Sequence, residues 1–231
     1  MNVALPLLST IVSFVFAGAV LVQYASRRRP YQLVWAIGLV WYGASTLTEV
    51  LWGLRVQNEA VYRLWYLIGV YFVASYLGMG TVYLLAPRRV AHWTMALLAL
   101  GSLVAVYLLL TVPVNLAALP GGRLTGDALP NYVRLLTPFF NTFGAAALVL
   151  GAAYSAWIYW SKHTYPERVV SNVLIAIGGL FPSTGGILLR LGIPDLFYLF
   201  EFIGVALIFA GFLANYEVIA SRFAWKAKTA G

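Results

Sequence analysis

The stretch VALPLLSTIVSFVFAGAVLVQYA (3–25) contains no charged residue and is followed at once by SRRRP (26–30). A helix rises about 1.5 Å per residue, so this run is long enough to cross the hydrocarbon core of a bilayer. No basic residue precedes the run, which is typical of a retained first span rather than of a cleaved signal peptide. The arginine triplet marks the end of this span that we expect in the cytoplasm.

Similar apolar runs fill almost the whole chain of 231 residues, which is 62% hydrophobic and only 10% charged. Too few polar residues remain to cover a soluble core, whereas lipid accepts such a surface. The sequence therefore predicts one all-α domain over residues 1–231, a polytopic membrane protein built as a bundle of seven transmembrane helices. The predicted spans are about 3–25, 31–54, 64–86, 93–115, 136–160, 169–192 and 195–218.

The charges between the spans indicate the orientation. Ten of the 15 basic residues follow the first, third, fifth and seventh spans: Arg27, Arg28, Arg29, Arg88, Arg89, Lys162, Arg168, Arg222, Lys226 and Lys228. Basic residues gather on the cytoplasmic side of membrane proteins. We therefore expect the N-terminus outside and the C-terminus in the cytoplasm, with anionic lipid head groups at the basic rim and no binding of nucleic acid. The segment 115–138 then lies outside, either as a cap on the bundle or as a simple linker.

Two halves of the chain resemble each other. RPYQLVWAIG (29–38) aligns with VVSNVLIAIG (169–178), and IGV at 68–70 recurs at 203–205. These matches predict a parallel 3+1+3 internal repeat with the fourth span as connector, although short matches also arise by chance in apolar sequence.

Small residues recur every fourth position at Ala147, Gly151 and Ser155. They form a flat helix face, for packing inside the bundle or for homo-oligomer contacts.

Ionisable residues inside the spans are the main functional signal. Glu49, near the end of span two, and Glu201, near the start of span seven, lie at similar depths in the outer third of the bilayer. Arg190 approaches this level from span six, and Thr46 and Asn141 lie at a comparable depth. A charge in lipid is costly unless it is paired, so we expect the glutamates to face the interior and at least one to meet Arg190. The set forms either a ligand or proton site or a structural ion pair.

The sixth span contains GGLFPSTGG (178–186). Pro182 cannot donate to the carbonyl one turn earlier, at Gly178, and Ser183 and Gly185 follow it. The pattern is typical of a broken helix that serves as a hinge or lines a substrate site, and equally of a simple proline kink.

Several cofactors and activities lack the residues they need. The last span has no lysine for retinal, and the two histidines, His92 and His163, lie at span edges, where they cannot ligate a b-type haem. No cysteine is present, and no histidine–acid cluster suits a catalytic zinc or a serine protease. We therefore expect no enzyme, no metal site and no required cofactor. The many aromatic side chains suit contact with a carotenoid, a quinone or a lipid tail, and ordinary core packing explains them equally well.

The stretches YRLWYLIG (62–69), YLGMGTVYLLAPRRV (76–90), NVLIAIGGLFPSTGG (172–186) and GVALIFAGFL (204–213) resemble a group of uncharacterised bacterial seven-helix membrane proteins. The resemblance implies a multi-pass protein of the bacterial cytoplasmic (inner) membrane and no particular activity.

Three functions follow as hypotheses. The first is a non-enzymatic sensor or accessory module that binds a small ligand or lipid in an outer polar pocket. The second is a transporter of a small solute, or one coupled to protons, that uses the broken sixth span. The third is a structural subunit of a larger membrane complex.

Overall fold

The computed structural model describes the backbone of residues 3–190 and 194–229, and the side chains of residues 3–182 and 196–214. All regular secondary structure in the described part is helical, which confirms the all-α prediction. The long helices are α1 (Ala4–Arg27), α2 (Pro30–Gly53), α4 (Val73–Leu85), α5 (Arg88–Thr111), α7 (Leu136–Ser161), α8 (Pro166–Arg190) and α9 (Pro194–Thr229).

Six stretches of the described part are long and apolar enough to cross a membrane. They are Ala4–Arg27, Pro30–Gly53, Glu59–Leu85, Arg88–Thr111, Asn131–Ser161 and Leu196–Ala214. The chain is therefore a multi-pass membrane protein by length and composition of its helices. Helix α8 has the length of a span, but the side chains of its last eight residues lie outside the described part, so the count of seven stays a prediction.

The third predicted span, 64–86, begins earlier and is less regular than expected. It consists of α3 (Glu59–Leu64), a π-helix η1 (Trp65–Phe72) and α4, which follow each other without a break. Asn58 starts α3 early because its side-chain oxygen accepts a hydrogen bond from the backbone N–H of Val61, at 2.9 Å. Short polar side chains of this kind favour a helix start. The span was predicted from its apolar residues, and that pattern does not include a polar cap.

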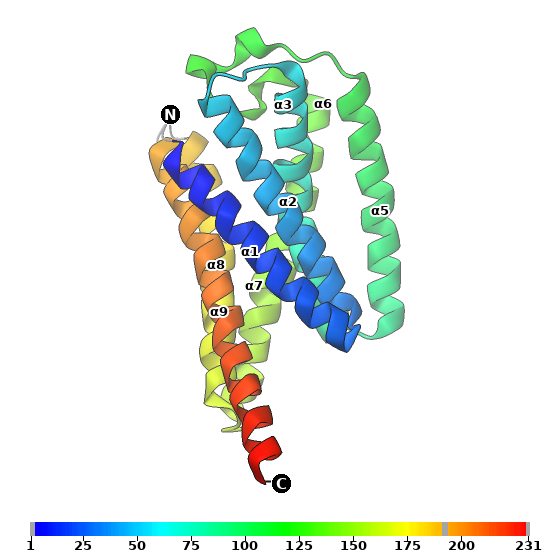
Figure 1. Cartoon of the computed structure of the whole chain (residues 1–231). Helices are drawn as coiled ribbons and strands as arrows, with labels where there is room; N and C mark the ends of the chain where they lie inside the picture. Colours follow the sequence, from blue (N-terminus) through cyan, green and yellow to red (C-terminus); the bar gives the residue numbers. More distant parts are fainter. Residues whose placement is uncertain (1–2, 191–193, 230–231) are drawn as a thin grey trace.

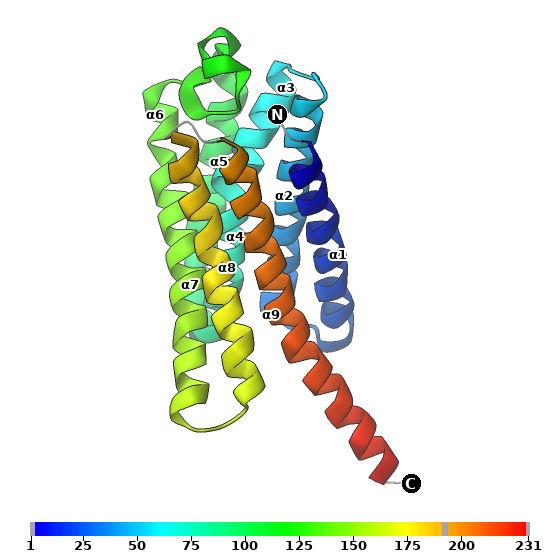
Figure 2. The ribbon, with the colours of Figure 1, turned by 90° about the vertical axis from the view of Figure 1, so that its left-hand side faces the viewer.

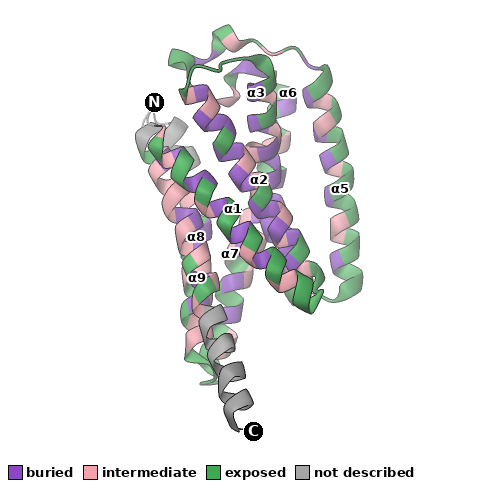
Figure 3. Ribbon diagram, viewed as in Figure 1, coloured by how far each residue is buried: buried purple, intermediate pink, exposed green. Residues whose placement is uncertain are grey.

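The helices form a closed ring with one helix beside it (Figures 1 and 2). Helix α1 packs on α2, α2 on α4, α4 on α7, α7 on α8, α8 on α9, and α9 returns to α1. We call α1, α2 and the α3–η1–α4 segment the first set, and α7, α8 and α9 the second set. Helix α5 stands apart from both and contacts mainly α4 and η1, as Figure 1 shows. Its outer face is largely exposed (Figure 3).

Glycines allow the two sets to approach each other closely. A side chain added at Gly144 of α7 would place its Cβ 2.2 Å from the backbone carbon of Ala74 in α4. Gly78 of α4 lies against the backbone of Gly144 in return. Further along α7, a Cβ at Gly151 would lie 2.4 Å from the Thr81 side chain. The small-residue face predicted in this span is thus used, at Gly151, for packing within the chain, and an oligomer contact through Ala147, Gly151 and Ser155 stays a proposal.

The segment between α5 and α6 (Asn131–Arg134) crosses one end of the bundle, which we call the capped end. It contains three short 3₁₀ helices: η2 (Leu116–Ala118), η3 (Pro120–Gly122) and η4 (Gly126–Ala128). The indole N–H of Trp52 donates to the Gly122 carbonyl at 2.8 Å, and the Tyr62 hydroxyl donates to the Thr125 carbonyl at 2.7 Å. These bonds make the segment a fixed cap rather than a loose linker.

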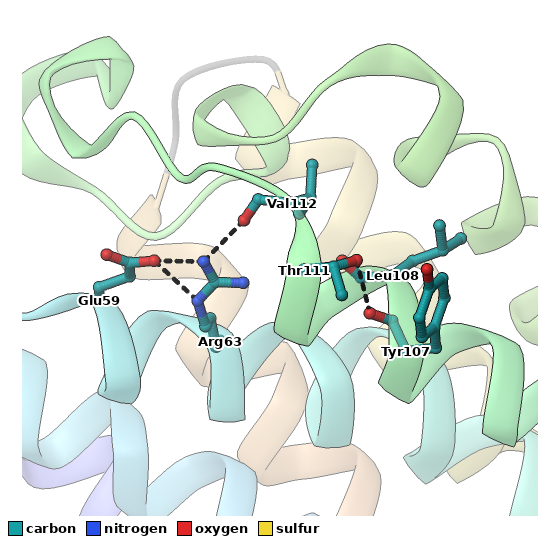
Figure 4. Close-up of polar contacts among 6 residues, drawn as sticks. All are labelled: Glu59, Arg63, Tyr107, Leu108, Thr111 and Val112. Carbon is teal, nitrogen blue, oxygen red and sulfur yellow. Dashed lines mark hydrogen bonds and ion pairs between the residues drawn. The ribbon is translucent and has the colours of Figure 1, made fainter.

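Arg63 forms further contacts at the capped end (Figure 4). Its guanidinium pairs with Glu59 one turn earlier and donates to the Val112 carbonyl at 2.6 Å, where α5 ends. Nearby, the Thr111 hydroxyl donates to the Tyr107 carbonyl at 2.8 Å and so stays within its own helix. The opposite end of the bundle carries Arg27–Arg29, and we call it the arginine end.

Candidate functional site

Glu49 lies on α2, four residues before the helix ends at the capped end. Its side chain is 1% exposed. One carboxyl oxygen, Oε1, accepts a hydrogen bond from the indole N–H of Trp65 at 3.0 Å, whereas Oε2 has no partner among the described residues. A buried carboxyl group with one open oxygen is expensive inside a membrane-spanning bundle and is a sign of function or of a missing partner.

Trp65 is the first residue of the π-helix η1. The wider turns of a π-helix are rare and occur often at functional sites. Within this segment Gly69 lies so close to α2 that an added Cβ would be 2.1 Å from the Ser45 hydroxyl oxygen. The π-helix thus holds Trp65 against Glu49 while its backbone contacts α2. Neither feature was predicted, because a π-helix has no hydrophobic periodicity that distinguishes it from an α-helix over so few residues.

Glu201 enters the same site from α9, in the second set. Its carboxyl group lies near enough to the Glu49 carboxyl group for the two to interact electrostatically. Its Oε2 atom is buried and also has no partner among the described residues. The Tyr42 hydroxyl of α2 donates to the backbone carbonyl of Glu201 at 2.8 Å, which fixes α9 against α2 at this level. The structure therefore brings together the two glutamates that the sequence placed at one depth.

Buried hydroxyl groups of α1 and α2 lie near the level of Glu49 along the bundle. Thr46 is fully buried, and its hydroxyl is 2.8 Å from the hydroxyl of Thr10 and 3.1 Å from the Tyr42 carbonyl. Ser9 and Ser13 of α1 are also fully buried, and their hydroxyl oxygens have no partner among the described residues. We call the whole group the polar cluster: Ser9, Thr10, Ser13, Tyr42, Thr46, Glu49, Trp65 and Glu201.

The other predicted site residues lie elsewhere or outside the described side chains. Asn141 of α7 donates its amide to the Val70 carbonyl of the π-helix at 3.0 Å, so it supports η1 rather than the carboxyl pair. The side chain of Arg190 lies outside the described residues, so its pairing with a glutamate stays a prediction.

The proposed hinge in the sixth span is described only in part. Helix α8 continues from Pro166 to Arg190 through Pro182, so the chain stays helical where a break was expected. A proline removes one backbone hydrogen bond, and a helix can continue on both sides of it. Gly178 lies against α9, where an added Cβ would be 2.8 Å from the Gly204 carbonyl oxygen. The Ser183 side chain and the surroundings of Gly185 lie outside the described part, and a hinge role stays a prediction.

A separate apolar crevice of about 40 Å³ lies between the two sets, nearer the arginine end. Its walls include Phe16, Leu39, Leu77, Leu148 and Ile208, and they present no polar surface. Its lining is hydrocarbon throughout. It offers no atom that would orient a polar ligand.

No three His, Cys, Asp or Glu side chains gather within the described residues, so this part of the chain holds no group that suits a catalytic zinc. The polar cluster contributes only carboxyl, hydroxyl and indole groups. It can bind a proton, a cation or a hydrogen-bond donor, and it presents no activated nucleophile. Comparison with family models, curated proteins and solved structures finds no match to this chain.

Proposed function

We propose that this chain is a non-enzymatic membrane protein that binds a small, positively charged ligand in the polar cluster. The observation that supports this proposal is the pair of glutamates, one from each set, whose Oε2 atoms are buried and without a partner among the described residues. Two carboxyl groups in contact repel each other when both are ionised, so the site favours an occupant with positive charge. Binding of that occupant links α2 to α9 and so couples the two sets.

The capped end is the outer end in this proposal. Basic residues crowd the arginine end, which favours a cytoplasmic position for it in a bacterial inner membrane. Ligand then reaches Glu49 from outside, across about four residues of α2 or about 6 Å. The protein acts as a sensor or accessory module and passes its state to a partner through the relative position of the two sets.

Native mass spectrometry of the gently extracted protein tests this function. We expect a discrete added mass on the wild-type chain that is lost in the double variant Glu49→Gln, Glu201→Gln. The matched control is Glu59→Gln, because Glu59 is an exposed glutamate at the same end, paired with Arg63. A bare wild-type protein, or an added mass that survives in the double variant, would contradict the proposal.

A transporter is the second candidate, and the glycine contacts favour it. Gly38 and Gly178 occupy equivalent positions of the aligned segments, and each contacts the third helix of its own set, at Leu77 and Gly204. Gly69 and Gly204 are equivalent in the same way, and each contacts the second helix of its set. Equivalent contacts in both sets support the 3+1+3 repeat, an arrangement that transporters use for alternating access.

Flux into vesicles tests the transport candidate. Chain reconstituted into vesicles would move protons or a small cation, and Pro182→Ala would slow that movement while the protein still inserts. Absence of flux in the wild type would leave the binding module as the better proposal.

A further inference from the structure

Open oxygen atoms are concentrated in the polar cluster. Seven buried side-chain N or O atoms of the described residues have no hydrogen-bond partner, and four of them belong to this cluster: Ser9 Oγ, Ser13 Oγ, Glu49 Oε2 and Glu201 Oε2. Native structures satisfy nearly all buried polar atoms, so four open oxygens in one place indicate an absent occupant.

Contacts between the helices place these residues at similar levels along the bundle. Phe16 of α1 stacks on Phe209 of α9 with ring centroids 4.8 Å apart, and the two helices run in the same direction (Figures 1 and 2). Ser9 lies seven residues before Phe16, which brings it level with Phe202, the neighbour of Glu201. Ser13 lies one turn nearer the stack. The bond between Thr10 and Thr46 joins α1 to α2 one turn before Glu49.

The charge of the site decides the class of occupant. Two ionised carboxyl groups side by side repel each other, and a cation held between them relieves that repulsion.

The donor atoms match the same class. Carboxylate and hydroxyl oxygens are ligands of hard metal cations, and helices that line cavities in membrane proteins coordinate Na⁺ with such oxygens. A water molecule could satisfy the two serine hydroxyls but would leave the repulsion between the carboxyl groups in place. We infer that the polar cluster binds a metal cation, with Na⁺ as the probe, through Glu49, Glu201, Ser9 and Ser13. This inference rests on the proposed function and names its ligand.

Thermal unfolding of the full chain in lipid nanodiscs tests the inference. The midpoint is measured in NaCl, KCl and choline chloride at constant ionic strength, and its rise with Na⁺ concentration gives the affinity. We expect Na⁺ to raise the midpoint above its value in choline chloride. Ser13→Ala should weaken the affinity about 10-fold or more, as the loss of a ligand to a charged group does. Ser75→Ala, at a buried serine bonded to the Tyr71 carbonyl, is the matched control and should keep wild-type affinity.

Other outcomes overturn the inference. Equal midpoints in all three salts would do so, as would equal effects of Ser13→Ala and Ser75→Ala. A wild type without a Na⁺ response that loses stability on Arg190→Gln would show that arginine neutralises the carboxyl pair instead. If methylammonium raises the midpoint and Na⁺ does not, the inference of a metal cation is wrong, whereas the proposed function stands. If neither cation changes the midpoint, and the added mass survives in the double variant Glu49→Gln, Glu201→Gln, both the inference and the proposed function are wrong.

Discussion

Substitution of Gly144 by alanine is the sharpest test of the packing between the two sets. The new Cβ would lie 2.2 Å from the Ala74 backbone carbon and 2.3 Å from its carbonyl oxygen. Ordinary contact begins at about 3.4 Å, so α4 and α7 must separate by roughly 1 Å. Backbone atoms cannot rotate away as a flexible side chain can. Overpacking of this kind costs about 1–3 kcal/mol, or several degrees in the midpoint of thermal unfolding.

Gly18 of α1 provides the control, because an added Cβ there would meet nothing within 4 Å. Gly18→Ala should leave the midpoint unchanged or raise it slightly, since alanine favours helix more than glycine does. The two variants are compared by tryptophan fluorescence during heating in the same nanodiscs. Equal midpoints for Gly144→Ala and Gly18→Ala would refute the close approach of α4 and α7 and the ring of helices that depends on it.

Two further substitutions test the capped end and the core. Trp52→Phe removes the hydrogen bond to the Gly122 carbonyl, so limited proteolysis should cut the segment 120–126 faster than in the wild type. An unchanged rate of cleavage would show that the cap does not depend on this bond. Tyr71→Phe leaves the Val133 carbonyl, at 2.8 Å in the wild type, without its donor and should cost about 1–3 kcal/mol of stability. Tyr107→Phe, at a tyrosine 65% exposed on α5, should cost far less in the same unfolding assay, and equal losses would contradict the buried position of Tyr71.

The spans could be predicted because lipid imposes a simple rule on sequence. A run of about 20 apolar residues must be a helix that satisfies its own backbone, and the predicted ranges agree with the observed helices to within a few residues for most spans. Two helices depart from the prediction. The third span starts early because of the Asn58 cap, and the last helix extends to Thr229, beyond the predicted end at 218.

The site was only partly predictable for a different reason. The depth of Glu49 and Glu201 follows from counting residues, and it correctly placed them together. Depth does not tell which residues share an interface, so Asn141, at a similar level, lies on the other side of the π-helix. Trp65 and the serines of α1 were missed, since serine and tryptophan are common in spans and only three-dimensional contacts single them out.

The choice between a ligand site and a purely structural ion pair depends on hydrogen-bond satisfaction. Elsewhere several buried hydroxyls and indoles donate to backbone carbonyls, as Trp52, Tyr62, Tyr71 and Ser75 do. A structural lock between α2 and α9 would be built in the same way, because each open oxygen costs about 1–3 kcal/mol. The polar cluster instead leaves four oxygens open while Trp65 and Tyr42 hold its framework in place. A fixed framework around unsatisfied acceptors is what a preorganised cation site requires, and a structural pair has no use for it.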